Sequence, residues 1–192
     1  MAPPRDIAVL VGSLRRESFN RKAALGLARL APERLSLAIV GIGALPLYDQ
    51  DLDDDPPAAW TDFRERVRRA DGLLFVTPEY NRSVPGVLKN AIDVGSRPYG
   101  KSAFANKPGA VISVSPGRYG GFGANHHLRQ SCVFLDIPLM QQPEAYLGGV
   151  SDATFGPDGA VEDAAARKLL KRFIDAYADW IETILREPRQ PH

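Results

Sequence analysis

The chain has 192 residues, a length that fits one compact domain better than two. Its 24 Lys and Arg nearly balance its 23 Asp and Glu, and a net charge of +1 argues against a general nucleic-acid or anionic-membrane binder. Glycine (17) and proline (16) together make up 17% of the chain, against a usual roughly 12%. Either the chain is loosely built, or these residues are concentrated in special loops.

The single cysteine, Cys132, excludes an internal disulfide and any site with several thiolates. A reduced, cytoplasmic compartment is therefore expected. No apolar run precedes Ile7, so a secretory signal is not expected, and no stretch approaches the ~20 apolar residues that span a bilayer. Residues from about 187 to 192 hold proline and no apolar periodicity, and are expected to be a flexible tail.

The first half of the chain alternates between apolar runs and helical patterns. Residues 7–11 form a continuous apolar run, which is typical of a strand buried on both faces. Helical spacing follows from Phe19 until Pro32, and residues 35–42 are a second strand candidate. After an aspartate-rich connection, Pro56 and Pro57 suit the start of a helix whose apolar face holds Trp60, Phe63, Val67 and Ala70.

The second half repeats this alternation. Residues 72–77 read as a buried strand that stops at Pro78, and residues 84–94 as a helix with Pro85 in its first turn. Residues 110–114 predict a fourth strand, 125–135 a fourth helix, and 138–140 with their neighbours a short fifth strand. A turn at 156–159 precedes the longest helix, whose predicted inner face is Val161, Leu169, Phe173, Tyr177, Trp180, Ile181 and Ile184.

Strands that alternate with helices predict an α/β domain with a parallel sheet covered on both sides. Ligands of such sheets bind beyond the carboxyl ends of the strands. We therefore expect the site in the loops after the first, third and fourth strands. No internal repeat or interdomain linker interrupts the chain, so residues 1–192 are interpreted as one domain.

The first of these loops, residues 12–20, reads GSLRRESFN. Its hydroxyls, its guanidinium groups and the N–H groups of a following helix suit an anion, and phosphate is the usual one. Equally, Ser18 could simply cap the helix while the arginines are solvated. The loop is neither the dinucleotide-binding pattern GxGxxG nor a Walker loop, so a metal-assisted nucleotide hydrolase has little support.

The other two loops suit a flat ligand. Residues 77–86 read TPEYNRSVPG, in which two prolines rigidify the ends and polar and aromatic groups alternate between them. Glu79 and Asn81 could instead cap the next helix. Residues 115–123 read SPGRYGGFG, where glycines allow close approach of the backbone to a ligand. The combination of three unusual loops carries more weight than any one of them.

These residues, with LKNAID at 88–93, HLRQ at 127–130 and Pro143-Glu144, resemble the NADPH-dependent FMN reductase family over nearly the whole chain. The similarity is greatest to its bacterial quinone and chromate reductase members. It implies a flavodoxin-like three-layer sandwich with a five-stranded parallel sheet in the order 2-1-3-4-5. Departures from the family pattern at Arg82 and at residues 116–119 bear on the substrate and on subunit contacts.

The resemblance also implies the residues that contact FMN. The phosphate would be held by the first loop and the start of its helix, at Ser13, Arg15, Ser18, Phe19 and Asn20. The isoalloxazine ring would be contacted by Pro78, Glu79, Tyr80 and Asn81. Its other edge would be lined by Ser115, Gly117, Gly120 and Gly121.

The resemblance implies an FMN-dependent NAD(P)H oxidoreductase. In this hypothesis, hydride passes from NADPH or NADH to N5 of the flavin and then to a quinone, free flavin, an azo compound or chromate. The flavin carries the chemistry, so no protein nucleophile, catalytic triad or metal is expected. A homodimer or homotetramer is implied, with no nucleic acid and no membrane as partners. A flavodoxin-type electron carrier and a non-catalytic FMN-binding module are the alternatives, although carriers are usually strongly acidic around the flavin.

Several other polar residues have simpler interpretations. His126 and His127 are adjacent and lack metal-site spacing, so a packing or surface role is favoured. Cys132 is expected to be a small buried hydrophobic residue. The aspartates at 49–55 lack the EF-hand pattern and suggest a solvated loop, or a subunit contact by the resemblance. Lys89 and Asp93 are expected to form a surface or interface pair.

Overall fold

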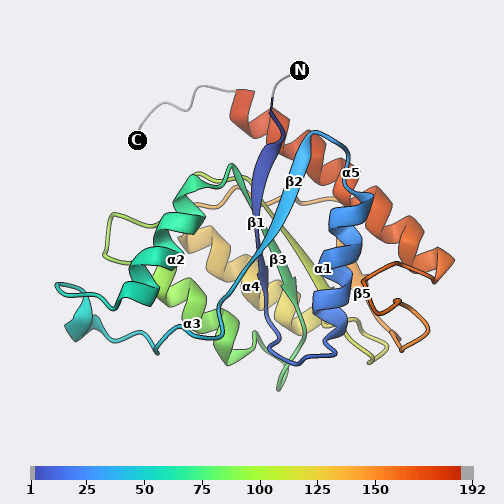
Figure 1. Ribbon diagram of the computed structural model, residues 1–192, viewed down its shortest axis with the longest axis horizontal. Helices are drawn as coiled ribbons and strands as arrows, with labels where there is room; N and C mark the ends of the chain where they lie inside the picture. The colour runs from blue at the N-terminus through green and yellow to red at the C-terminus, as the bar shows by residue number, and fades with distance from the viewer. Residues whose placement is uncertain (1–2, 187–192) are drawn as a thin grey trace.

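The structure is a computed structural model that describes residues 3–186. Its sheet has five parallel strands in the order β2-β1-β3-β4-β5 (Figure 1). The strands are β1 (Arg5–Val11), β2 (Leu35–Val40), β3 (Gly72–Thr77), β4 (Gly109–Val114) and β5 (Ala145–Leu147). Every residue of β3 and β4 is buried, as continuous apolar runs predict for strands covered on both faces.

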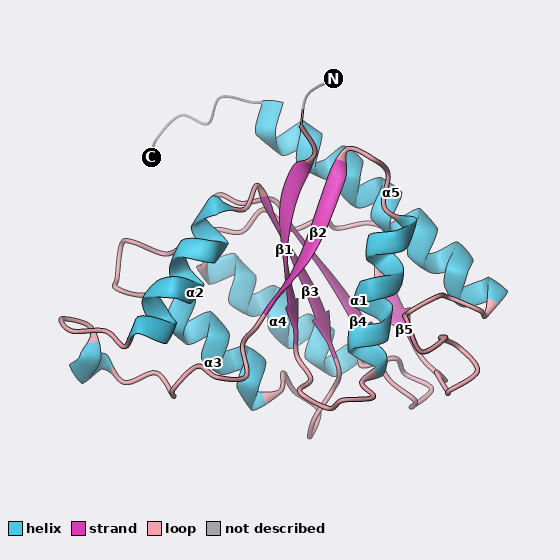
Figure 2. Ribbon diagram, viewed as in Figure 1, coloured by secondary structure: helices cyan, strands magenta, loops and turns pink. Residues whose placement is uncertain are grey.

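Five α-helices cover the two faces of this sheet (Figure 2). One layer holds α1 (Phe19–Leu30) and α5 (Ala164–Arg186), whose apolar faces share a core cluster. The other layer holds α2 (Ala58–Arg69), α3 (Gly86–Gly95) and α4 (Phe122–Phe134), which share a second cluster. The predicted flavodoxin-like three-layer fold and its strand order are therefore confirmed.

Two predicted apolar faces can be compared with the packing. In α2, Trp60, Phe63 and Val67 are buried as predicted, and Ala70 is buried at the end of the helix. In α5, Phe173, Tyr177 and Ile181 are buried, whereas Leu169, Trp180 and Ile184 are only half-buried. Val161 is buried too, but it precedes the helix. The 3.6-residue period therefore identified the centre of each apolar stripe better than its edges.

The position predicted for the fifth strand was wrong. Residues 138–140 make a single bridge, Gly109 with Leu139, and the strand forms instead at Ala145–Leu147. Pro138 has no N–H group with which to extend a ladder. Ala145, by contrast, pairs with Ile112 in the middle of β4, and the ladder continues to Leu147 beside Val114.

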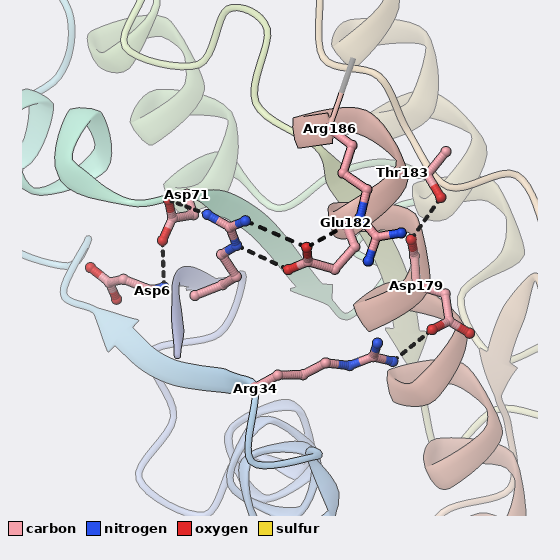
Figure 3. Close-up of polar contacts among 8 residues, drawn as sticks. Asp6, Arg34, Asp71, Asp179, Glu182, Thr183 and Arg186 are labelled. Atoms are coloured by element: carbon pink, nitrogen blue, oxygen red, sulfur yellow. Dashed lines mark hydrogen bonds and ion pairs between the residues drawn. The ribbon is translucent and has the colours of Figure 1, made fainter. Parts of the chain in front are cut away.

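Charged side chains attach β1 and α5 to each other at the amino ends of the strands (Figure 3). Arg5 Nε donates to Glu182 at 3.0 Å, and an Arg5 guanidinium nitrogen lies 3.9 Å from Asp71. Arg34, just before β2, pairs with Asp179 of α5 at 2.6 Å. These contacts link the two ends of the described chain at the edge of the sheet opposite the three selected loops.

The tail expected at residues 187–192 lies outside the described residues. Among residues 3–186, no helix has both the length and the apolar character needed to cross a membrane.

Candidate cofactor site

The three selected loops meet at the carboxyl ends of β1, β3 and β4, at the lower edge of the sheet in Figure 1. The Gly12 amide donates to the carbonyl of Val76 at 2.9 Å, at the end of β3. A Cβ on Gly12 would lie 3.1 Å from Pro78 Cδ, so the first two loops are in close contact. The predicted cofactor residues all lie in these loops or in the first turn of α1.

The first loop ends at a capped helix. Ser18 is 2% exposed, and its hydroxyl accepts from the Arg21 amide, so it is the N-cap of α1. The capping role considered for Ser18 is thus present, and it does not prevent the neighbouring amides from facing a ligand. Ser13 is half-buried and Arg15 is exposed, and Arg15 forms no ion pair with any described residue.

Asn20 is the most informative side chain of the site. Its Nδ2 donates to the carbonyl of Val114 at 3.1 Å, which attaches the start of α1 to the end of β4. Its Oδ1 is buried and has no hydrogen-bond partner among residues 3–186. Since a buried acceptor without a donor is costly, this atom fits a ligand hydroxyl or amide.

The second loop is a tight hairpin. The amide and carbonyl of Tyr80 bond those of Ser83, at 3.1 and 3.0 Å, and Asn81 and Arg82 between them have φ angles of 51° and 63°. Tyr80 is 46% exposed. The backbone N–H groups of Glu79 and Asn81 have no partner among the described residues. A flat ligand would therefore find an aromatic ring and free donors here.

The carboxylate of Glu79 is turned toward α4. Its Oε2 accepts from the Ala124 amide at 3.0 Å, in the first turn of the helix, where the helix dipole favours negative charge. Arg82 lies 3.4 Å from its Oε1, and the Glu79 side chain is only 13% exposed. Any contact of Glu79 with a ligand is thus expected from its backbone rather than from its carboxylate.

The third loop is held close to the end of β5. Gly117 donates to Ser115 Oγ at 3.1 Å, and the Gly149 amide donates to the carbonyl of Gly117. A Cβ on Gly120 would lie 2.8 Å from the carbonyl carbon of Tyr146, so the glycine permits this close approach. Gly121 has φ 77° and is the N-cap of α4, which begins at Phe122, three residues earlier than predicted.

The two histidines on α4 have specific partners that sequence reasoning missed. His127 Nδ1 lies 3.0 Å from Ser83 Oγ in the hairpin, and His126 Nε2 lies 3.0 Å from the Tyr146 hydroxyl. Burial raises the pKa of Tyr146 to about 12. The histidines are surface residues, as predicted, but the Ser83 contact spans 44 positions, so no local pattern reveals it.

The remaining candidates have structural roles. Cys132 is fully buried, as predicted, and burial raises the pKa of its thiol to about 12. Lys89 and Asp93 form the predicted surface pair at 2.7 Å. Within residues 3–186, no group of three His, Cys, Asp or Glu residues is placed to hold a metal ion. The aspartates at 49–55 are not all solvated, because Asp53 accepts from the Tyr48 hydroxyl and pairs with buried Arg64.

Comparison with known proteins decides the family. The model of the NADPH-dependent FMN reductases matches residues 5–152. The chain belongs to this family. It is 58% identical over 183 residues to a quinone reductase of Pseudomonas putida, across 95% of this chain and 97% of that protein. It is also 51% identical to a 2-hydroxy-1,4-benzoquinone reductase of a Burkholderia species, across 91% and 95% of the two chains.

A solved structure agrees with this family assignment. The flavoenzyme FerB of Paracoccus denitrificans, an NAD(P)H:(acceptor) oxidoreductase, superimposes with a TM-score of 0.88. It shares 41% sequence identity, and the match covers 93% of this chain and 98% of FerB. As an NADPH-dependent FMN reductase, the protein is an FMN-dependent oxidoreductase, and an electron carrier or a non-catalytic module is not favoured.

The residues present fit FMN, the cofactor of this FMN reductase family. The unpartnered Asn20 Oδ1 supplies a buried acceptor, the start of α1 supplies amide donors, and the exposed Arg15 lies in the loop that precedes this helix. The glycines of the third loop supply backbone without Cβ atoms. Together these features match a ligand with a phosphate, a hydroxylated chain and a flat ring.

Proposed function

We propose that the protein transfers hydride from NAD(P)H to quinones at the carboxyl ends of β1, β3 and β4. The observation that carries this proposal is the meeting of the three loops around the unpartnered Asn20 Oδ1. The quinone reductase named among the relatives, at 58% identity over most of both chains, supports a quinone as the acceptor. Free flavin, azo compounds and chromate are further candidate acceptors.

The proposed FMN-binding residues divide by loop. Ser13, Arg15, Ser18, Phe19 and Asn20 would hold the phosphate end of the cofactor. Pro78, Glu79, Tyr80 and Asn81 would lie against the ring, and Ser115, Gly117, Gly120 and Gly121 would line its other edge. The packing supports this division, because a Cβ on Gly12 would lie 3.1 Å from Pro78 Cδ and Asn20 Nδ2 bonds the carbonyl of Val114, so the three loops are neighbours.

When bound, FMN supplies the ability to accept and return a hydride, so the protein needs no nucleophile of its own. The role of the protein is to bind FMN and to orient its ring. The free N–H groups of Glu79 and Asn81 can donate to acceptor atoms of the ring and stabilise negative charge that builds there. Arg15 supplies a charged donor for the phosphate.

The proposal also includes the domain organisation, the compartment and the oligomeric state of the protein. One FMN-binding domain, formed by the chain as a whole, would take small molecules as its substrates and would act in the cytoplasm. A homodimer or homotetramer is proposed from the family resemblance. The exposed side chains of Leu47 (80%) and Phe134 (76%) supply apolar surface that such subunit contacts could bury.

An absorbance spectrum of the purified protein tests the proposal. We expect a flavin absorption band in the blue region of the visible spectrum, which NADPH bleaches under nitrogen and benzoquinone restores. A colourless protein that fails to take up added FMN would contradict the proposal. A yellow protein with negligible steady-state NADPH oxidation would indicate an electron carrier instead.

The same assay separates the candidate donors and acceptors. NADPH and NADH are compared at equal concentration, first with benzoquinone and then with free FMN, an azo dye and chromate. We expect the highest kcat/KM with a quinone. A quinone turned over more slowly than all other acceptors would refute quinone reduction as the activity.

A further inference from the structure

We propose that α4 positions the hairpin at residues 79–83, and that His127 is a positioning residue that acts through Ser83. The inference rests on the proposed function for its consequence, because this hairpin is the segment proposed to contact the FMN ring. How α4 holds the hairpin is argued from the contacts of Glu79 and Ser83 with this helix.

Few contacts within the hairpin hold its conformation, and one of them is the ion pair of Glu79 with the exposed Arg82 at 3.4 Å. Two main-chain hydrogen bonds, both between Tyr80 and Ser83, close it. Asn81 and Arg82 have φ angles of 51° and 63°, a conformation that non-glycine residues adopt at a cost. A two-residue turn of this kind prefers glycine at its second position, where this chain has Arg82. The conformation therefore depends on contacts outside the hairpin.

The first outside contact attaches the near side of the hairpin. Glu79 Oε2 accepts from the Ala124 amide at 3.0 Å. The helix has a glycine next to this point, and a Cβ on Gly123 would lie 2.9 Å from Glu79 Oε2 and 3.0 Å from the carbonyl oxygen of Arg82. Glycine at position 123 thus allows the hairpin to lie directly against the first turn of α4.

The second outside contact attaches the far side. Ser83 Oγ lies 3.0 Å from His127 Nδ1. Ala124 and His127 are three positions apart and so lie on one face of α4, which means that the same helix face holds both sides of the turn. His126, the neighbouring histidine, bonds the Tyr146 hydroxyl instead and forms no hydrogen bond with residues 79–83.

The pair Ser83–His127 is therefore expected to set how often the hairpin occupies its binding-competent conformation. A neutral side-chain hydrogen bond of this kind shifts such an equilibrium by about three- to tenfold. Because affinity scales with the competent fraction, loss of the bond weakens FMN binding by up to this factor, which is reached when the competent conformation is the minor one.

Five single variants and one double variant test this inference. His127→Ala and Ser83→Ala each remove the bond. His127→Asn retains a polar atom near the position of Nδ1, whereas His127→Gln places its polar atoms beyond it. His126→Ala is the matched control, since it removes an adjacent exposed histidine from the same helix. Thermal unfolding of each variant checks that the fold is retained.

Two measurements are made on each variant. Hydrogen exchange of the Tyr80 and Ser83 amides is measured by NMR in FMN-free protein, and FMN affinity is measured by titration. We expect exchange to rise about three- to tenfold in His127→Ala, His127→Gln and Ser83→Ala, and the FMN Kd to rise by up to the same factor. His127→Asn and His126→Ala are expected to resemble wild type. The double variant His127→Ala/Ser83→Ala should lose no more than either single variant.

The two measurements keep this inference separate from the proposed function. Wild-type protein that fails to bind FMN would overturn the proposed function, while the exchange comparison would still decide whether His127 holds the hairpin. Unchanged exchange of the hairpin amides in His127→Ala would overturn the inference. So would equal effects of His126→Ala and His127→Ala, or a fully additive double variant.

Discussion

The two ends of the sheet are built differently. At the amino ends of the strands, polar groups are paired: Arg66 forms two bonds of 2.9 Å with Asp6, and Arg5 bonds Glu182. The buried Tyr177 hydroxyl donates to the carbonyl of Leu73 at 2.7 Å. At the carboxyl ends, Asn20 Oδ1 is unpartnered and Arg15 forms no ion pair with a described residue.

The backbone does not share this contrast. Asn81 and Arg82 have positive φ angles at the carboxyl ends, but so do Asn106 and Asp136 in the segments that precede β4 and β5. The difference between the ends therefore lies in their polar side chains, and unpaired polar groups reduce stability unless a ligand compensates for them. The amino end therefore stabilises the fold, whereas the carboxyl end leaves polar groups available to a ligand. Variants at the two ends should therefore affect different measurements.

The largest expected effect is that of Arg15→Ala on FMN affinity. Loss of a charged hydrogen bond to the phosphate should cost roughly 1.5–3 kcal/mol, or about 10- to 100-fold in Kd. The unfolding free energy of the FMN-free protein should not change, because the Arg15 side chain is exposed. Arg16→Ala, at the adjacent exposed arginine, is the control for the loss of one charge. Wild-type affinity in Arg15→Ala would show that Arg15 does not bind the phosphate.

Tyr177→Phe tests the opposite end of the sheet. It removes a hydroxyl that donates to the buried carbonyls of Leu73 and Pro108, so urea unfolding should show a loss of about 1–3 kcal/mol. FMN affinity should stay at the wild-type value. Tyr80→Phe, which removes an exposed hydroxyl at the carboxyl end, should leave the unfolding free energy unchanged. Equal destabilisation by both variants would break the contrast between the two ends.

Much of this contrast could be predicted from the sequence. Continuous apolar runs at 72–77 and 110–114 predicted two buried strands. In the strand order of a flavodoxin-like sheet, the loops that follow these two strands lie beside the first loop. The predicted site residues therefore lie together at one edge. Which of them contact FMN stays a prediction.

Other features depended on distant contacts that no local pattern encodes. Glycines at 120, 121 and 123 argue locally against a helix, yet α4 begins at Phe122 because Gly121 caps it and Gly123 admits the hairpin. The fifth strand forms at Ala145–Leu147 because that segment pairs with β4, whereas the equally apolar residues 138–140 do not. The Ser83–His127 contact arises in the same way.

Glu182→Gln should have a smaller effect that depends on pH. The hydrogen bond from Arg5 holds the pKa of Glu182 below its usual range. The unfolded carboxyl therefore binds a proton more readily than the folded one, and the contribution is present at neutral pH and lost as the pH falls below about 4.3. Because both side chains are partly exposed, wild type should exceed the variant by under ~1 kcal/mol at pH 7. Unfolding free energies that differ equally at pH 7 and at pH 3 would contradict this linkage.

The smallest expected effect is that of Arg118→Ala, at the carboxyl end. Arg118 is exposed in the third loop and forms no ion pair with a described residue, so it can attract a negatively charged acceptor to the site. The variant should lower kcat/KM for a sulfonated naphthoquinone by about two- to fivefold while leaving that for uncharged benzoquinone unchanged. The loss should disappear in high salt, where the attraction is screened. The control Arg172→Ala removes the same charge from α5 and should leave kcat/KM unchanged for both quinones. An equal loss of kcat/KM for the sulfonated quinone in both variants would assign the effect to net charge rather than to the position of Arg118.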